Sequence, residues 1–503
     1  MVGIVGVLGR TSAANQSELV KRMSLAISHR GDEKLFKCLS SDDGFSAIAV
    51  RSRLDCDHRV RTSQDGVGVL DQWNPSGLVE GRVDSPFPIT DEPDSYSNPD
   101  SVLGTLDAMV VSLGKTGLMS SRSTFSMKPF YYQCRDSDFI FSTERKAIWR
   151  LGFYEAAELQ PGQVLSVIPG RKPSTRQRVR MARPDTGSPL SRKEAIQTLS
   201  SNISNSFRRL HGLRNVGVLF SGGVDSSLAA TLAQDVCKNV TLIAACAEQS
   251  YDDRRASGVA DRLGMVLLKV RIEPAAVWEL LPELMYAVES SRRLDIEIAL
   301  PFYLAARQAH DAGLSVLVSG QGPDELFAGY ARYLQTFIRE GEEALDKQLW
   351  NDVIATHRNN IERDERAIEY NQVSAFFPYL DGHFILTAMS IPSSWKVAPD
   401  VTPDRKLIFR ELAQDMGLPV EIASAPKKAT QYSSGSGRVI AKAVRANVQS
   451  KNDSSDASES TLVQAALNKI ASEIGIPLVG PVRGDLMMDL MPTMRLIERI
   501  RRV

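Results

Sequence analysis

Cysteine is scarce in this sequence, and long apolar runs and an excess of one charge are absent. The five cysteines are scattered and form no CxxC pair, which argues against a disulfide framework or a zinc site and favours a reducing compartment. Lysine plus arginine and aspartate plus glutamate both total 60, so no global charge attracts nucleic acid or acidic membranes. The apolar run at residues 1–8 is too short for a signal or a membrane span. We expect a soluble, cytoplasmic protein without nucleic-acid or membrane partners.

The spacing of apolar residues divides the chain into a β-rich first third and an α/β remainder. Short apolar or alternating runs predict strands near residues 2–8, 45–50, 66–70, 139–142 and 163–168. Residues 171–190 contain many prolines and arginines and predict a linker. The expected domains are therefore residues 1–170 and residues 191–503.

Beyond the linker, short apolar runs alternate with segments that have helical apolar spacing. The runs predict strands at residues 216–220, 240–246, 265–270 and 315–319. Strands that alternate with helices predict a parallel sheet covered on both faces. After Asp324 the spacing is mostly helical, which predicts a helical extension of the α/β domain.

The first predicted strand of this sheet runs directly into the sequence SGGVDSS at residues 221–227. Glycines let the backbone approach a ligand, and a helix N-terminus presents free N–H groups to an anion. Asp225 would repel a bare phosphate unless a divalent cation lies between them. The same composition also occurs in turns that only cap a helix. No Walker GxxxxGK[ST] pattern occurs.

The fourth predicted strand opens into GQGPDELFAGY at residues 320–330, which carries the acids Asp324 and Glu325. Ligands of open α/β sheets bind outside the carboxyl ends of the strands, so both glycine turns should face one crevice. Asp225 and Asp324 would then be oxygen ligands for one Mg²⁺ that bridges phosphates. The alternative for Asp324 and Glu325 is a solvated helix start, where acids complement the helix dipole.

Ser-Gly-Gly-x-Asp-Ser is the signature of ATP pyrophosphatases, and the paired motifs resemble asparagine synthetase and its relatives, including lactam synthetases. Residues 377–381 (FPYLD) and 425–428 (APKK) are similar to further motifs of that family, in the family's order. The resemblance implies an Ntn-type αββα sandwich followed by an ATP-pyrophosphatase α/β domain. It implies ATP and Mg²⁺ as cofactors, and it implies ATP or pyrophosphate contacts from Ser221, Gly222, Gly223, Asp225, Ser226, Ser227, Gly320 and Gly322.

The resemblance also implies catalytic roles for residues around the crevice. In the family a carboxylate attacks the α-phosphate, and a lysine stabilises the developing charge; by position this lysine is Lys427. Asparagine synthetases commonly carry a glutamate where this chain has Gln321, and glutamine cannot act as a base. Lactam-forming relatives pair a tyrosine there with a later glutamate, near Glu362. The general base is therefore left open between Glu325, Glu362 and a bound water, and the alternative role for Gln321 is to orient the nucleophile.

The N-terminal region resembles the family's glutaminase domain without its nucleophile. The family begins Met-Cys-Gly-Ile, whereas this chain begins Met-Val-Gly-Ile, so Val2 replaces the cysteine that attacks glutamine. The segments at residues 29–32 (HRGD) and 128–132 (KPFYY) still resemble the family's motifs. We expect a degenerate glutaminase domain that is retained as a scaffold.

These observations predict an AMP- and pyrophosphate-forming carbon–nitrogen ligase that adenylates aspartate and transfers it to ammonia or an amine. The alternatives are an amide- or lactam-forming ligase with another substrate, and a non-catalytic regulator that binds ATP. The expected partners are small molecules, and homodimer formation is left open.

Overall fold

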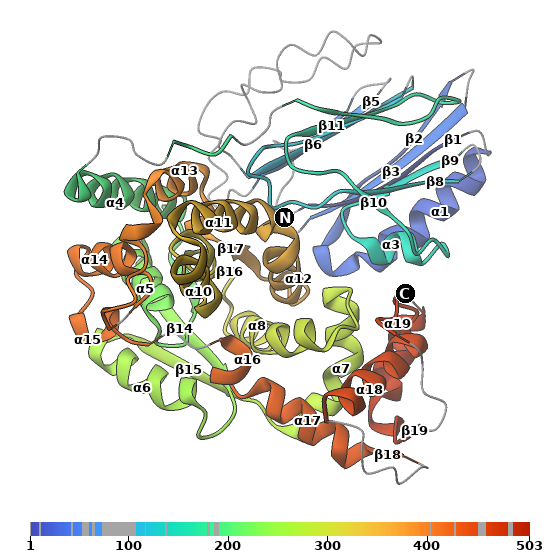
Figure 1. Ribbon diagram of the computed structural model, residues 1–503. Helices are drawn as coiled ribbons and strands as arrows, with labels where there is room; N and C mark the ends of the chain where they lie inside the picture. The colour runs from blue at the N-terminus through green and yellow to red at the C-terminus, as the bar shows by residue number, and fades with distance from the viewer. Residues whose placement is uncertain are drawn as a thin grey trace.

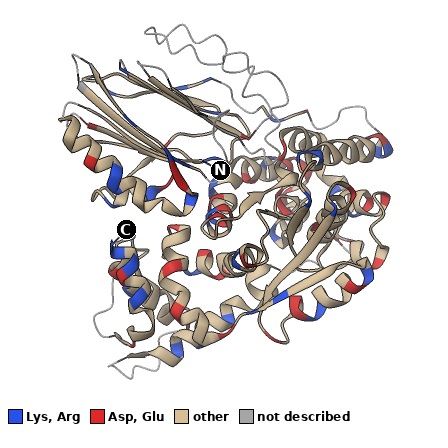
Figure 2. Ribbon diagram, turned by 180° about the vertical axis from the view of Figure 1, so that it is seen from behind, with Lys and Arg blue, Asp and Glu red and all other residues tan. Residues whose placement is uncertain are grey.

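The fold combines two antiparallel sheets with a parallel sheet that is surrounded by helices (Figure 1). The computed structural model describes residues 2–9, 12–41, 44–52, 60–62, 66–72, 107–115, 117–135, 138–178, 182–185, 191–402, 404–426, 429–450, 459–480 and 486–502. Within these residues every helix is too short or too polar to span a bilayer. Figure 2 shows Lys and Arg interspersed with Asp and Glu along the helices.

The two antiparallel sheets come from the first 177 residues, and each sheet contains strands that are far apart in sequence. The first sheet has the strand order β10-β8-β9-β1-β3-β2. Its strands are β1 (Gly3–Gly9), β2 (Asp32–Ser41), β3 (Gly44–Ser52), β8 (Tyr131–Arg135), β9 (Asp138–Ser142) and β10 (Ala157–Glu158). The second sheet has the order β12-β11-β7-β6-β5-β4. Its strands are β4 (Val60–Thr62), β5 (Gly66–Gln72), β6 (Ala108–Gly114), β7 (Leu118–Arg122), β11 (Gln163–Val167) and β12 (Ser174–Gln177).

Strand β1 is buried on both faces because it lies between the second sheet and a helical layer. Ile4 and Leu8 pack into the core between the two sheets, whereas Val5 and Val7 pack against α1 (Ala13–Ala26) and α3 (Arg145–Trp149). This alternation is the two-residue period of a strand. Gly6 is required, because a Cβ there would collide with the ring of Phe141. The described layers are thus helices, first sheet and second sheet.

The parallel sheet has the strand order β15-β14-β13-β16-β17, so the chain reverses direction across the sheet at β13. Its strands are β13 (Asn215–Leu219), β14 (Asn239–Cys246), β15 (Val266–Arg271), β16 (Val316–Val318) and β17 (Ser374–Phe376). Val218 of β13 packs into one apolar core with helix α5 (Val224–Val236), while Ile243 and Leu317 pack into a second core with the helices that connect β15 to β16. Both faces are therefore covered, as parallel sheets require.

The remaining elements are mostly helical and surround this sheet. The helices are α4 (Arg192–Arg208), α5 (Val224–Val236), α6 (Tyr251–Leu263), α7 (Pro274–Val288), α8 (Arg293–Asp311), α9 (Pro323–Leu326), α10 (Ala331–Glu340), α11 (Glu342–Thr356), α12 (Glu362–Glu369), α13 (Gly382–Ser390), α14 (Leu407–Asp415), α15 (Val420–Ala423), α16 (Thr430–Ser433), α17 (Ser436–Asn447), α18 (Glu459–Ile474) and α19 (Met494–Arg502). Strands β18 (Val448–Ser450) and β19 (Leu486–Met488) pair as a small antiparallel sheet, with α18 between them in the sequence. Figure 1 shows α19 below α3, where the Arg150 guanidinium donates to the carbonyl of Arg501 at 3.4 Å.

The expected α/β fold class is confirmed: a sandwich of two antiparallel sheets, with one helical layer among the described residues, precedes a parallel sheet with a helical extension. The apolar runs predicted β1, β3, β5, β9, β11, β13, β14, β15 and β16 to within two residues, but they missed the internal strands β6, β7 and β8. They did not predict β2, because this edge strand carries Asp, Glu and Lys and buries little apolar surface. Strand β12 falls inside the range predicted as linker and pairs with β11.

Candidate functional site

The turn between β13 and α5 brings backbone and hydroxyl groups to the carboxyl end of the sheet. Gly222 has φ of +72°, and a Cβ there would lie 3.0 Å from Cγ of Arg255. Glycine is therefore required both by the backbone conformation and by the close packing. The Ser226 hydroxyl donates to the Gly223 carbonyl at 3.3 Å and lies 3.4 Å from the Ser221 hydroxyl. Two hydroxyl groups are thus held together at the start of α5.

The turn after β16 packs directly against the turn after β13. A Cβ on Gly320 would lie 3.0 Å from the backbone nitrogen of Ser226 and 3.1 Å from the carbonyl carbon of Asp225. This contact exists because β13 and β16 are neighbours in the sheet, although about 100 residues separate them in the sequence. The strand order reverses between them, and such a switch point is where open α/β sheets bind ligands.

Asp225 and Asp324 converge on one buried cation, the side chain of Lys406. The Lys406 Nζ lies 2.8 and 2.7 Å from the two carboxylate oxygens of Asp225, and 2.8 Å from Oδ1 of Asp324. Lys406 is fully buried and has a left-handed backbone with φ of +59°. Gly329 makes room for this contact, because a Cβ there would collide with Asp324 and Lys406. A left-handed lysine costs conformational energy, so the surrounding contacts must hold it in place.

A small cavity of about 110 Å³ lies beside these turns. The predicted residues that line it are Ser221, Asp225, Ser226, Gly320 and Gln321. Residues from β14, α8 and α16 complete the wall, including Ala245, Phe302 and Thr430.

Other predicted site residues lie elsewhere. Gly222, Gly223 and Gly322 shape the two turns and do not line the cavity. Ser227 is fully buried, and its hydroxyl has no hydrogen-bond partner among the described residues. Lys427 lies outside the described residues, so its predicted contact stays a prediction.

Glu325 lines a second and larger cavity of about 550 Å³. Its Oε1 accepts hydrogen bonds from the Tyr330 hydroxyl at 2.7 Å and from the Asn360 amide at 2.8 Å. Burial and the neighbouring carboxylate of Asp324 raise the pKa of Glu325 to about 7. A carboxylate in this range is ionised in part at neutral pH and is able to accept a proton.

Gln321 is paired with Asp364 and not with Glu362, which lies near the position where lactam-forming relatives carry the partner glutamate. The Gln321 amide donates to Oδ2 of Asp364 at 2.5 Å. Glu362 instead lies 2.5 Å from the guanidinium of Arg366 and 3.3 Å from that of Arg145. Successive side chains of α12 are rotated by 100°, so Glu362 and Asp364, which are two residues apart, face different neighbours. Glu362 is thus held by ion pairs with two arginines and faces away from Gln321.

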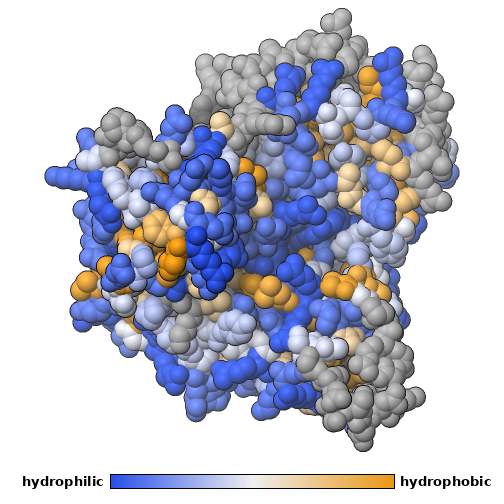
Figure 3. Space-filling model, viewed as in Figure 1, coloured by the Kyte–Doolittle hydropathy of each residue, from blue (hydrophilic) through white to orange (hydrophobic). Residues whose placement is uncertain are grey.

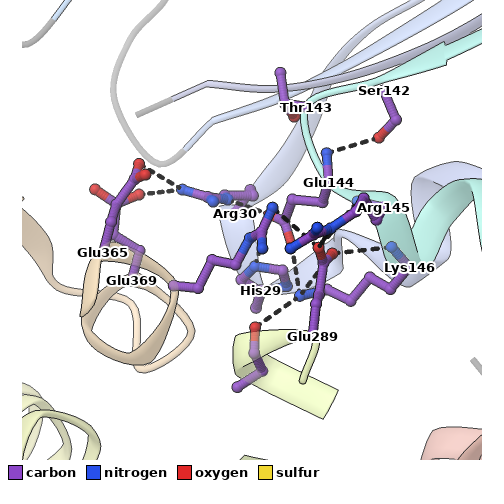
Figure 4. Close-up of polar contacts among 12 residues, drawn as sticks. His29, Arg30, Ser142, Thr143, Glu144, Arg145, Lys146, Glu289, Glu365 and Glu369 are labelled. Atoms are coloured by element: carbon purple, nitrogen blue, oxygen red, sulfur yellow. Dashed lines mark hydrogen bonds and ion pairs between the residues drawn. The ribbon is translucent and has the colours of Figure 1, made fainter. Parts of the chain in front are cut away.

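A buried ion-pair cluster joins the antiparallel sheets to the parallel-sheet region (Figure 4). Glu144 contacts His29 Nε2 at 3.0 Å, Lys146 Nζ at 2.5 Å and the guanidinium of Arg30. Arg30 also contacts Glu369 of α12. Burial lowers the pKa of His29 to about 4, so its imidazole is neutral near pH 7.

Glu289, which follows α7, completes this junction from the other side. Its carboxylate accepts hydrogen bonds from the backbone nitrogens of Arg145 at 3.1 Å and Lys146 at 2.9 Å, at the start of α3. A carboxylate is favourable there because it meets unpaired N–H groups and the positive end of the helix dipole. The residues that resemble a glutaminase motif, His29 and Arg30, therefore hold the two regions together.

Replacing Glu144 with glutamine should destabilise this junction by about 3–5 kcal/mol, because Arg30 and Lys146 would lose a buried counter-charge. Urea unfolding and limited proteolysis measure the effect. Glu155→Gln is the control, because Glu155 is exposed and lies near α3. Equal unfolding midpoints for the two variants would show that the cluster does not stabilise the junction.

The comparison with known proteins agrees with this geometry. The family model described as asparagine synthase matches residues 199–344 and 338–472, which together cover more than half of the chain. The chain belongs to the asparagine synthase family. The matched residues contain both glycine turns, Asp225, Asp324 and Lys406.

Curated relatives carry asparagine synthetase names. "Putative asparagine synthetase [glutamine-hydrolyzing] 1" of Methanocaldococcus jannaschii is 29% identical over 87% of this chain and 85% of its own length. Asparagine synthetase [glutamine-hydrolyzing] of Sandersonia aurantiaca is 29% identical over 44% of each chain. That of Gallus gallus is 25% identical over 61% of this chain and 60% of its own length. Membership of this family makes the chain a carbon–nitrogen ligase, and ATP-dependent amide synthesis is the chemistry that it supports.

Proposed function

We propose that this protein adenylates the side-chain carboxylate of aspartate, releases pyrophosphate, and transfers the acyl group to ammonia or an amine. The observation that carries the proposal is the convergence of Asp225, Asp324 and Lys406 at the switch point of the parallel sheet. Attack on the α-phosphate places negative charge on phosphorus and on the leaving pyrophosphate. Fixed cations and helix N–H groups at this point lower that barrier.

The two aspartates fit Mg²⁺ by their chemistry. Magnesium in nucleotide sites takes one or two carboxylates and completes its shell with phosphate oxygens and water. Asp225 and Asp324 supply two such carboxylates, and no group of three or more His, Cys, Asp or Glu arranged for a metal occurs in the described part of the chain. Bound Mg²⁺ would neutralise phosphate charge.

The chain's own groups would orient the nucleotide and balance its charge. The Ser221 and Ser226 hydroxyls line the small cavity and would donate to phosphate oxygens. Lys406 supplies a buried positive charge to the same turns. Lys427 is the proposed second cation, which would meet the α-phosphate as charge develops there.

The amine does not come from glutamine in this proposal. Val2, which stands where the family has cysteine, carries no nucleophile, and its side chain is 2% exposed in the core between the antiparallel sheets. Glu325 is the proposed general base, because its carboxylate lines the larger cavity and has no cationic partner in an ion pair among the described residues. It would take the proton that the amine loses as it attacks the acyl carbon.

Pyrophosphate and AMP release, measured with ATP, Mg²⁺ and aspartate, tests this function. We expect turnover with ammonium and none with glutamine. Turnover with glutamine would contradict the assignment of the N-terminal region. Release with other carboxylates but not with aspartate would favour the alternative of a ligase for another substrate. No release with any carboxylate would favour an ATP-binding regulator.

A further inference from the structure

The larger cavity lies where elements from both regions of the chain meet. Its wall includes Arg145 from α3, the α7–α8 junction, α10, and residues 357–361, which form a turn of π-helix before α12. Figure 3 shows a hollow lined by hydrophilic side chains on the face where Figure 1 places α8, α10 and α12. A π-helical turn is a rare feature that is often found at functional sites. Asn360, which donates to Glu325, lies in this turn.

The volume of this cavity is far larger than ammonia requires. It measures about 550 Å³, whereas a water molecule, which is similar in size to ammonia, takes up about 30 Å³ in the liquid. Cavities of about 300–1,000 Å³ are typical of sites for organic ligands. The cavity therefore has room for an amine that carries a substantial group.

Within the described part of the chain, the charges on the cavity wall are paired except at three positions. Arg332 is paired with Asp352, and the guanidiniums of Arg145 and Arg366 contact acids from α12 and the α7–α8 junction. Arg292 and Arg358 are exposed, line the cavity and have no ion-pair partner among the described residues. Glu325 is the unmatched acid, because its two partners, Tyr330 and Asn360, are neutral.

One acid and two arginines that have no ion-pair partner among the described residues match a molecule that carries one amine and one anionic group. We infer that this cavity binds the amine substrate, and that this substrate is a zwitterionic amine of the amino-acid or short-peptide class. Its amine meets Glu325, and its carboxylate meets Arg292 and Arg358. This inference rests on the proposed function and deepens it by replacing ammonia with a larger acceptor.

A matched series of amines tests the inference. Glycine, glycylglycine and triglycine are each compared with their C-terminal amides and with ammonium, with ATP, Mg²⁺ and aspartate present. The C-terminal amide removes the negative charge and has nearly the same size. For at least one of the three chain lengths, we expect the KM of the free carboxylate to be at least about tenfold lower than the KM of its amide. A single charge-assisted hydrogen bond to the carboxylate would give a difference of this size. Equal KM values for acid and amide at every length, or ammonium as the best acceptor, would overturn the inference.

The double variant R292A/R358A tests whether these two arginines cause the preference for the carboxylate form. It should abolish the preference for the carboxylate form and leave ATP–pyrophosphate exchange with aspartate unchanged, because adenylation precedes amine binding. Arg208→Ala, an exposed arginine of α4 outside the cavity, should keep the preference. A preference that survives in R292A/R358A would overturn the inference. A tenfold rise in the KM of aspartate in the exchange reaction would also overturn it, because the arginines would then hold the adenylated substrate.

The exchange reaction also separates the two proposals. Normal exchange without any preference among amines refutes the zwitterionic acceptor alone. No exchange in the unmodified protein with any carboxylate refutes the proposed function and this inference together.

Discussion

Replacing Asp225 with asparagine should lower kcat/KM for pyrophosphate release by about 10²–10³-fold, the usual cost of removing a preorganised electrostatic group. Both carboxylate oxygens of Asp225 lie within 2.8 Å of Lys406 Nζ, and the same carboxylate is a proposed Mg²⁺ ligand. Asparagine keeps the shape of the side chain but removes its charge. The ammonium group of Lys406 would then have only Asp324 as a counter-charge, and the Mg²⁺ concentration that gives half-maximal activity should rise.

Asp235→Asn is the matched control for this experiment, because Asp235 is an exposed residue at the other end of the same helix, α5. It should leave the rate and the Mg²⁺ dependence unchanged. Thermal unfolding of both variants separates lost chemistry from lost structure. Equal rates for the two variants, with both folded, would rule out a role for Asp225 in nucleotide activation.

Replacing Glu325 with glutamine should lower the rate of amide formation by about 10²–10⁴-fold, the range in which a general base contributes. ATP–pyrophosphate exchange should persist, because the base acts only after adenylation. Glutamine retains an oxygen that accepts from Tyr330 and Asn360, so the local hydrogen bonds survive. Glu340→Gln, an exposed position at the end of α10, is the control and should have no effect.

The proposed role of Glu325 also predicts how the rate of amide formation changes with pH. Burial and Asp324 raise the pKa of Glu325 to about 7, and only the ionised carboxylate accepts a proton. The rate of amide formation should therefore rise about tenfold per pH unit below 7 and level off above it. In Glu325→Gln this rise should disappear. A variant that keeps the pH profile of the unmodified protein would exclude Glu325 as the base.

Local sequence patterns predicted the parallel sheet and the two glycine turns because they reflect short-range physics. A buried strand that ends in Ser-Gly-Gly must turn before a helix begins, and the glycines permit the positive φ seen at Gly222. Gly320 packs on Ser226 because β13 and β16 are neighbours in the sheet. The alternation of strands and helices predicted a parallel sheet but not which strands are neighbours.

Local sequence patterns did not predict the contacts between segments that are distant in the sequence. Lys406 lies 181 residues after Asp225, and although residues 405–411 resemble a segment of the family, that resemblance did not identify Lys406 as a partner of two aspartates. Asp364 and Glu362 are two residues apart on one helix, and only the packing of α12 decides which of them meets Gln321. Resemblance to relatives placed the partner near Glu362 because it located the helix without fixing its rotation.

By itself, the sequence determined the alternation of strands β13 to β16 with helices, the two acid-bearing glycine turns, and the absence of a nucleophile at Val2. Each of these depends on residues that are close together along the chain. Only the tertiary structure decided that Lys406 lies between Asp225 and Asp324, and that Arg145 of the N-terminal region forms part of the larger cavity. These contacts depend on how separate elements pack, since side chains far apart in sequence meet only when the sheets and helices between them are in place.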